Sequence, residues 1–164
     1  MKSMKWMVSA VILACVPAVA SAQAVISERT LSYGAAMEMA TAAMESCRKG
    51  GYRVTITVLN RAGRTKVVLH DDGAGPHTIE NSLRKAYTSL TFRVPSGEFG
   101  KRMASTPPPH APMLLDKVTS GEGALPVMSN KEVIGSIGIS GAPGGHLDAA
   151  CAQAGIDKIA PGLN

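Results

Sequence analysis

Side chains that can bind a ligand or move a proton gather in residues 70–93 of this 164-residue sequence. Asp72 belongs to a pair of neighbouring carboxylates, His77 follows a glycine-rich loop, and Arg84 and Lys85 are neighbouring cations. A loop histidine can ligate haem iron or another metal, or transfer a proton near neutral pH. The two carboxylates can hold a cation, Asp72 can take part in acid–base chemistry, and the cations can pair with carboxylates of a ligand. This stretch is therefore the first candidate for a functional site.

A strand, a loop and a helix must position these residues. The apolar stretch 65–69 predicts a strand, and Gly73, Gly75 and Pro76 then interrupt regular structure. The helix that follows has an apolar face at the helical period, made by Ile79, Leu83, Ala86, Tyr87 and Leu90. We expect this face to pack on a sheet. The polar side carries Asn81, Lys85 and Thr88 beside Arg84.

The residues of this stretch also have a purely structural interpretation, and the sequence leaves both open. The acidic pair Asp71 and Asp72 can bond to backbone groups of the loop. His77 can bond to the backbone near the start of the helix, and Arg84 with Lys85 can form a solvated helix face. If the stretch is catalytic, Asp72, His77 and Lys85 are the candidates for acid–base chemistry.

Two later segments hold further candidate groups. His110 lies in the segment 107–112, whose prolines exclude a helix and a central strand, and it is either a second ligand or simply exposed. Residues 141–145 precede a predicted helix, so N–H groups near Gly141, Gly144 and Gly145 can bind an anion. The sequence has no Walker loop, no dinucleotide fingerprint in its βαβ context, and no HExxH, GxSxG or CxxC motif.

Residues 1–22 have the pattern of a secretory signal peptide, with a positive start, an apolar run and the small residues Ala-Ser-Ala before the cleavage point. We predict an exported protein, periplasmic or extracellular, with a single domain over 23–164 and no membrane segment after cleavage. The alternative is an uncleaved anchor. This segment also holds two lysines of the +5 net charge and the single Trp, so the remaining chain has no nucleic-acid-binding character. Cys47 and Cys151 remain, either as a disulfide or as buried thiols.

The predicted elements form one α+β domain. A helix over 31–49 is followed by a hairpin of strands 53–59 and 65–69, and then by the central helix. An irregular connection over 94–123, with a short helix at 96–104, leads to a second hairpin of strands 125–128 and 132–140. A last helix runs from His146 to Ala154 and stops at Gly155. Hairpins separated by helices favour an antiparallel sheet with helices packed on it.

Several of these segments resemble the GlcG/HbpS-like haem-binding family: DGAGPHT at 72–78, RKAYTSLTFR at 84–93, LPV at 125–127 and VIGSIGISGAPGG at 133–145. A last helix with Asp148 and Cys151 fits the same pattern, and the resemblance covers residues 31–159. It implies a profilin-like α/β/α sandwich, assembly into dimers or larger oligomers, and haem binding in some members. Some haem-binding members place an axial histidine in the first helix, and this sequence has none there.

Three functional hypotheses follow. In the first, an exported oligomer binds haem or a related planar ligand, with His77 on the iron, His110 or a first-helix methionine as the other ligand, and Lys85, Arg84 and Thr88 near the carboxylates. In the second, a small enzyme uses the same pocket on a small organic acid. In the third, the domain is a structural module without a small-molecule ligand.

Overall fold

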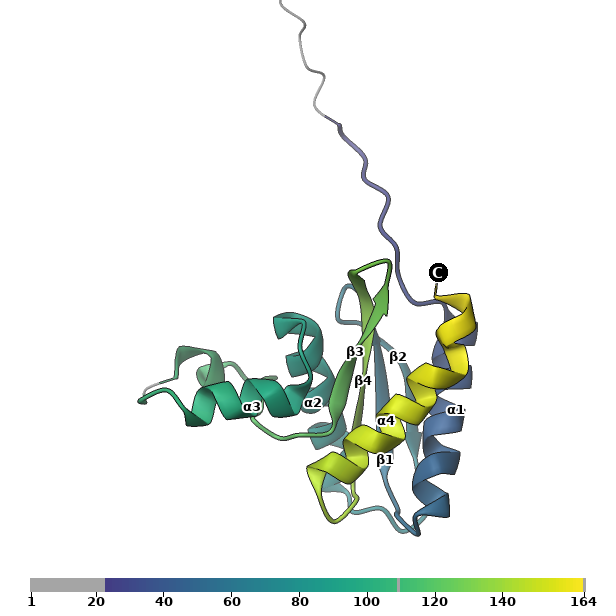
Figure 1. Cartoon of the computed structure of the whole chain (residues 1–164), viewed down its shortest axis with the longest axis vertical. Helices are drawn as coiled ribbons and strands as arrows, with labels where there is room; N and C mark the ends of the chain where they lie inside the picture. Colours follow the sequence, from purple (N-terminus) through teal and green to yellow (C-terminus); the bar gives the residue numbers. More distant parts are fainter. Residues whose placement is uncertain (1–22, 109, 164) are drawn as a thin grey trace, which may run out of the picture.

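A computed structural model describes residues 23–108 and 110–163, and in it four antiparallel strands form one sheet between two layers of helices (Figure 1). The strand order is β2-β1-β4-β3. Helices α1 and α4 cover one face of the sheet, and α2 covers the other with α3 beside it. The predicted α+β sandwich is thus confirmed. The elements are α1 Tyr33–Lys49, β1 Thr55–Asn60, β2 Thr65–His70, α2 His77–Phe92, α3 Ser96–Ala104, η1 Ala111–Leu114, β3 Ala124–Ser129, β4 Glu132–Ser140, α4 Gly145–Ile159 and η2 Ala160–Gly162.

The hydrophobic core lies between the sheet and the pair α1 and α4. Ile56 of β1 pairs with Ile139 of β4, and Val58 pairs with Ile137, so that all four side chains share this face and are fully buried. The helices contribute mainly small residues and methionines to the same cluster, including Ala36, Met39, Ala40, Ala43, Met44 and Ala152. The buried residues of α1 therefore recur at the helical period of 3.6, which is the pattern that predicted this helix.

The predicted end of the last helix at Gly155 is wrong, because α4 continues to Ile159. A Cβ atom at position 155 would lie 2.6 Å from the backbone oxygen of Met39 and 3.0 Å from the Cβ of Ala43. Gly155 therefore serves the close crossing of α4 over α1 and does not terminate the helix. A glycine inside a helix costs about 0.5–1 kcal/mol relative to alanine, which tertiary packing offsets here.

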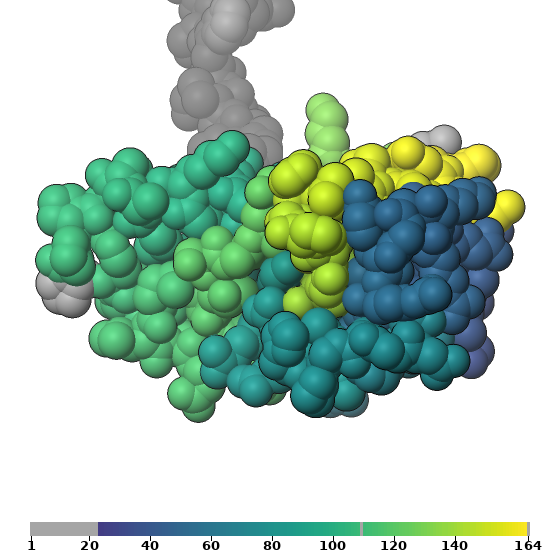
Figure 2. Space-filling view, turned by 90° about the horizontal axis from the view of Figure 1, so that it is seen from below, coloured from purple at the N-terminus to yellow at the C-terminus, as the bar shows by residue number. Residues whose placement is uncertain are grey.

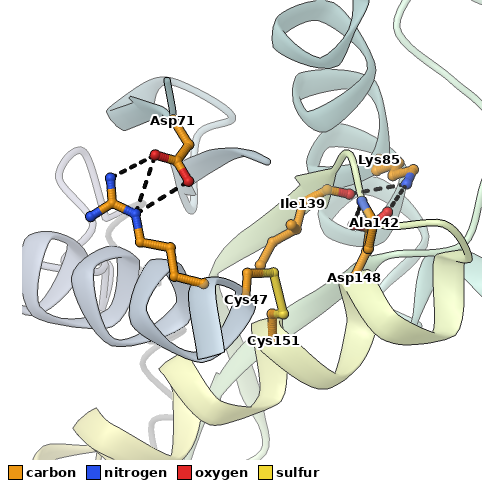
Figure 3. The surroundings of a disulfide bond; sticks show 8 residues. Cys47, Asp71, Lys85, Ile139, Ala142, Asp148 and Cys151 are labelled. Atoms are coloured by element: carbon orange, nitrogen blue, oxygen red, sulfur yellow. Dashed lines mark hydrogen bonds and ion pairs between the residues drawn. A yellow bond between two sulfur atoms is a disulfide. The ribbon is translucent and has the colours of Figure 1, made fainter. Parts of the chain in front are cut away.

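The disulfide between Cys47 and Cys151 is present and links α1 to α4 (Figure 3). Their Cα atoms are 5.4 Å apart, and 104 positions separate them in the sequence. In the chain-entropy model, closing a loop of about 100 residues stabilises the folded state by roughly 4.7 kcal/mol. The disulfide alternative left open by the sequence is therefore the one that the structure contains.

The prediction that the apolar face of α2 packs on the sheet is wrong for all of its residues except Ala86, which is buried against β4. The buried residues of α2 are Thr78, Ser82, Lys85, Ala86, Thr88 and Ser89. Ile79 is 46% exposed, and Leu83, Tyr87 and Leu90 are only half-buried. Among the residues that the structure describes, none of α2 belongs to the hydrophobic core cluster. The helix therefore turns its polar side to the sheet and its apolar side outward.

The sheet explains this orientation, because its face toward α2 is small and polar. Thr57 of β1 lies opposite Gly138 of β4, and Thr55 lies opposite Ser140. A Cβ atom at Gly138 would lie 2.6 Å from the backbone nitrogen of Ala86 and 2.8 Å from its Cβ. The helix backbone therefore touches the strand, and no space remains between them for leucine or isoleucine side chains.

The long connection after α2 is irregular except for two short helices, α3 and η1. The short helix expected at 96–104 is present as α3, and its Phe99 stacks on Phe92 with ring centroids 4.3 Å apart. The chain then passes through η1 to β3, an edge strand, where Pro126 is tolerated. No helix within 23–108 and 110–163 is both long and apolar enough to cross a membrane. The predicted signal peptide at 1–22 lies outside the described residues.

Substitution of Gly138 by alanine tests the contact between α2 and β4. We expect Gly138→Ala to destabilise the fold by about 1–3 kcal/mol or more, because the added methyl group overlaps the backbone of α2. Gly34→Ala is the matched control, since Gly34 is exposed in α1 and nothing lies within 4 Å of an added Cβ atom. It should be neutral or stabilising by roughly 0.5–1 kcal/mol. Urea unfolding of both variants measures the difference, and equal effects would contradict the proposed contact.

Candidate functional site

An open cavity of about 620 Å³ lies at the end of the sheet where β2 and β4 finish and β1 begins. Its volume is within the range of roughly 300–1,000 Å³ that is usual for small-ligand sites. Figure 2 views the molecule from this end, where the loop before α2 (teal), the start of α4 (yellow) and the chain before β3 (green) come close together. The lining includes many glycines: Gly51, Gly73, Gly75, Gly121, Gly141, Gly144 and Gly145.

The inner wall of the cavity contains a buried ion pair. Lys85 of α2 reaches the first turn of α4, where its Nζ donates to Oδ2 of Asp148 over 2.8 Å, and it also donates to the carbonyl oxygen of Ile139 over 3.0 Å (Figure 3). The backbone N–H of Ala142 donates to Oδ1 of Asp148 over 3.0 Å. Both side chains are almost fully buried. The pair therefore ties α2, the end of β4 and the start of α4 together.

Burial determines the protonation behaviour of Asp148. It raises the pKa of this carboxyl above its ordinary value, and the hydrogen bonds from Lys85 and from the backbone N–H of Ala142 oppose this shift without reversing it. Because Lys85 already faces a carboxylate, it does not act as an uncompensated cation toward a ligand. Two of the three ammonium donors are used within the protein, which leaves one N–H on a side chain that lines the cavity.

A second ion pair anchors the loop on the opposite wall. Arg48, at the end of α1, donates through Nη2 to Oδ1 of Asp71 over 2.6 Å and through Nε to both carboxylate oxygens over 3.2 Å. The hydrogen bond from Arg48 and its charge lower the pKa of Asp71, against the opposing effect of desolvation. Arg53 lines the cavity and lies 3.5 Å from the same carboxylate. Asp71 thus has a structural role as the ion-pair partner of Arg48, which the sequence did not predict.

Hydroxyl groups connect the sheet to the same loop. Thr78 donates to the carbonyl oxygen of Gly75 over 2.6 Å, so its oxygen must accept the proton of Thr55, 2.6 Å away. Thr55 in turn must accept from Nδ1 of His70, at 2.7 Å. Because the carbonyl of Gly75 can only accept, it determines which group donates in each of these three hydrogen bonds. His70 therefore carries a proton on Nδ1. These bonds hold the loop before α2 in place.

The structure brings some of the predicted site residues together. His77 lies on the exposed rim of the cavity, and its ring packs on Gly75, where a Cβ atom would be 2.8 Å from the imidazole Cε1. Lys85 lies in the inner wall. The predicted loop residues Gly141, Gly144 and Gly145 all line the cavity.

The other predicted residues do not line this cavity. Arg84 pairs with Glu80 over 3.0 Å on the outer side of α2. Thr88 accepts a hydrogen bond from the N–H of Thr119 over 3.0 Å, and His110 directly precedes η1 without a side-chain hydrogen bond to it. Asp72 is exposed. Within the described part of the chain, no hydrogen bond or ion pair joins Asp72 to His77 or Lys85, so the acid–base group considered for an enzyme is not assembled.

Arg53 lines the cavity but did not emerge from the sequence pattern, whereas Asn81, which also lines it, belongs to the predicted polar side of α2. Arg53 is the first residue of the predicted strand 53–59 and gave no signal beyond its charge. Asn81 donates to Oγ of Ser140 over 2.9 Å, a contact between residues 59 positions apart. Asp148 belongs to the family resemblance, but its pairing with Lys85 spans 63 positions and has no local sequence pattern.

Removal of one partner tests the buried ion pair. We expect Lys85→Met to destabilise the protein by about 3–5 kcal/mol, because Asp148 is then buried without its counter-charge. Arg84→Met is the matched control at the adjacent position, where loss of an exposed pair should cost less than about 0.5 kcal/mol. Denaturant unfolding gives both values. The double variant Lys85→Met with Asp148→Leu should recover most of the loss, and failure to do so would contradict direct coupling of the two charges.

Comparison with known proteins agrees with this architecture. Residues 31–157 match the family model described as haem degrading protein HbpS-like. A double mutant of HbpS from Streptomyces reticuli is 34% identical, with a TM-score of 0.76 over 88% of this chain and 97% of its own. ORFY from Klebsiella pneumoniae is 24% identical, with a TM-score of 0.78 over 85% and 97%. PduOC, solved as a haem complex, is 22% identical, with a TM-score of 0.72 over 79% and 95%.

The last two likenesses describe the fold alone. The family model covers most of the domain, and the HbpS structure aligns with nearly its whole length. The predicted family resemblance is therefore confirmed. The chain belongs to the family of HbpS-like haem-degrading proteins.

Proposed function

We propose that this protein binds haem, or a related planar ligand with carboxylate groups, in the cavity at the end of the sheet. The observation that carries the proposal is the glycine lining of two opposite walls, the loop with Gly73 and Gly75 and the loop with Gly141, Gly144 and Gly145. Because glycine has no side chain, the backbone at these positions can approach a flat ligand closely. Membership of the family supports haem as the ligand, and the same fold holds haem in the PduOC complex.

The residues present fit such a ligand. His77 is exposed on the rim, where its imidazole would ligate the iron. Arg53 replaces Arg84 in our proposal as the cation for a carboxylate, because it lines the cavity and its side chain is 57% exposed. The remaining N–H of Lys85 would donate to the ligand from the inner wall. The bound group would supply its own redox chemistry.

Titration with haemin tests this proposal. We expect the purified protein to shift the Soret band of haemin and to saturate. His77→Ala should weaken this binding by at least the roughly 10–100-fold that loss of an outer-shell partner costs a metal site. His110→Ala is the matched control and should behave as wild type, because His110 does not line the cavity. Wild type without a Soret shift would refute haem binding, and an unaffected His77→Ala variant would refute the ligand assignment.

We further propose that the protein is exported and works as a homo-oligomer. Export agrees with the signal-like segment 1–22 and with a disulfide, which persists in oxidising compartments. The outer side of α2 supports self-association, because Ile79, Leu83, Tyr87 and Leu90 form an apolar stripe outside the core. The i,i+4 pair of Glu80 and Arg84 borders this stripe and would offer both charges to an antiparallel copy of the same helix.

Substitution in the stripe tests self-association. We expect wild type to elute as a dimer or larger species, and Ile79→Glu to reduce its mass, because the new charge would be buried between two copies. Val68→Glu on β2 is the matched control, since Val68 is 45% exposed and Ile79 is 46% exposed. Size-exclusion chromatography with light scattering gives the masses. A monomeric wild type, or dissociation by Val68→Glu alone, would contradict this interface.

A further inference from the structure

We infer that the Cys47–Cys151 disulfide is a redox-sensitive clamp that holds the two glycine-rich walls of the cavity in their binding positions. The inference concerns control of the site and rests on the proposed function only for its ligand-binding consequence. Cys47 and Cys151 are buried and do not line the cavity, so the disulfide would act through the residues next to it.

On the α1 side, one peptide bond separates Cys47 from the residue that contacts the cavity loop. Arg48 follows Cys47 and makes the multiple hydrogen bonds to Asp71 described above. Asp71 begins the loop that contributes Gly73 and Gly75 to the lining, and its N–H donates to the carbonyl of Val54 over 3.0 Å. The position of the last turn of α1 therefore sets the position of this wall.

On the α4 side, the connection is one helical turn. Asp148 lies three residues before Cys151 and accepts from Lys85 and from the N–H of Ala142. Ala142 belongs to the loop that forms the opposite wall. Figure 3 shows the disulfide lying between these two groups of contacts, with Asp71 on one side and the Lys85–Asp148 pair on the other.

Another close contact between the two helices lies farther from the cavity. Gly155 packs on the backbone oxygen of Met39, about one turn beyond Cys151 on α4 and about two turns before Cys47 on α1. The helices would therefore stay together after reduction, while their ends at the cavity would lose the covalent link. Because both loops are glycine-rich, they have little resistance of their own to such movement.

The chemistry of the clamp is a two-electron exchange with a dithiol. A thiolate of the reductant attacks one sulfur, a mixed disulfide forms, and the second thiol of the reductant displaces the protein sulfur. Each protein sulfur takes up a proton, and the reductant leaves as a disulfide. Because both cysteines are buried, we expect reduction only by a reductant that acts on transiently opened protein.

Hydrogen exchange and haemin binding together test the clamp. The protein is compared oxidised, reduced with dithiothreitol, and as Cys47→Ala/Cys151→Ala. We expect amide exchange in residues 71–76 and 141–146 to become about tenfold faster or more, both in the reduced protein and in the double variant without the disulfide. The turn at 129–132, at the other end of the sheet, is the internal reference. If the binding-competent fraction falls to about a tenth, the haemin Kd rises about tenfold.

Two variants separate the clamp from a general loss of stability. Val127→Ala removes buried volume from β3 in the core and should not accelerate exchange selectively in the two loops. Arg48→Ala should loosen 71–76 and leave 141–146 protected. Unchanged loop exchange after reduction, or acceleration equal to that at 129–132, would overturn the inference. If wild type binds no haemin, the proposed function fails, while the exchange measurement still decides on the clamp.

Discussion

The structure depends on the direct contact between the backbone of α2 and β4 at Gly138. This contact brings helix and sheet too close for large side chains, so that hydroxyl groups fill the interface. Thr57 and Ser82 are 2.8 Å apart, and Ser82 donates to the carbonyl of Ile79, which makes Thr57 the donor to Ser82. Among the described residues, no buried side-chain polar atom lacks a partner. The interface therefore meets the main requirement for burying polar groups, which is a hydrogen bond for each.

The buried ion pair follows from the same geometry. Lys85 lies on the polar side of α2 and passes the end of the sheet, so its ammonium group emerges at the first turn of α4 on the other face. Burying two charges gives little net stability, because desolvation offsets their attraction. The pair instead selects one arrangement, since a shift of α2 or α4 would leave Lys85 or Asp148 buried without its partner. It joins the two helical layers at the place where the cavity forms.

The sequence was sufficient for features with a local cause. Alternation identified the strand over 53–59, the period of 3.6 identified α1 and α2, and the two cysteines offered the disulfide. It was not sufficient for the orientation of α2, because periodicity shows that Ile79, Leu83 and Leu90 share a face but not what that face contacts. The decisive residue is Gly138, which lies in a different element. The same limit applies to Lys85 and Asp148, whose pairing depends on the complete fold.

The cavity walls are made of loops with flexible glycines, and contacts with the helices hold these loops in place. Glycines such as Gly73 and Gly141 adopt positive φ values of 81° and 137° and present bare backbone, which few other residues could do. A loop of this composition would not hold a fixed shape alone. Each wall is therefore held by a contact with a helix. Arg48 of α1 binds Asp71 on one side, and on the other Asp148 of α4, itself paired with Lys85 of α2, binds Ala142. Preorganisation of the site thus resides in α1, α2 and α4 rather than in the loops that would touch the ligand.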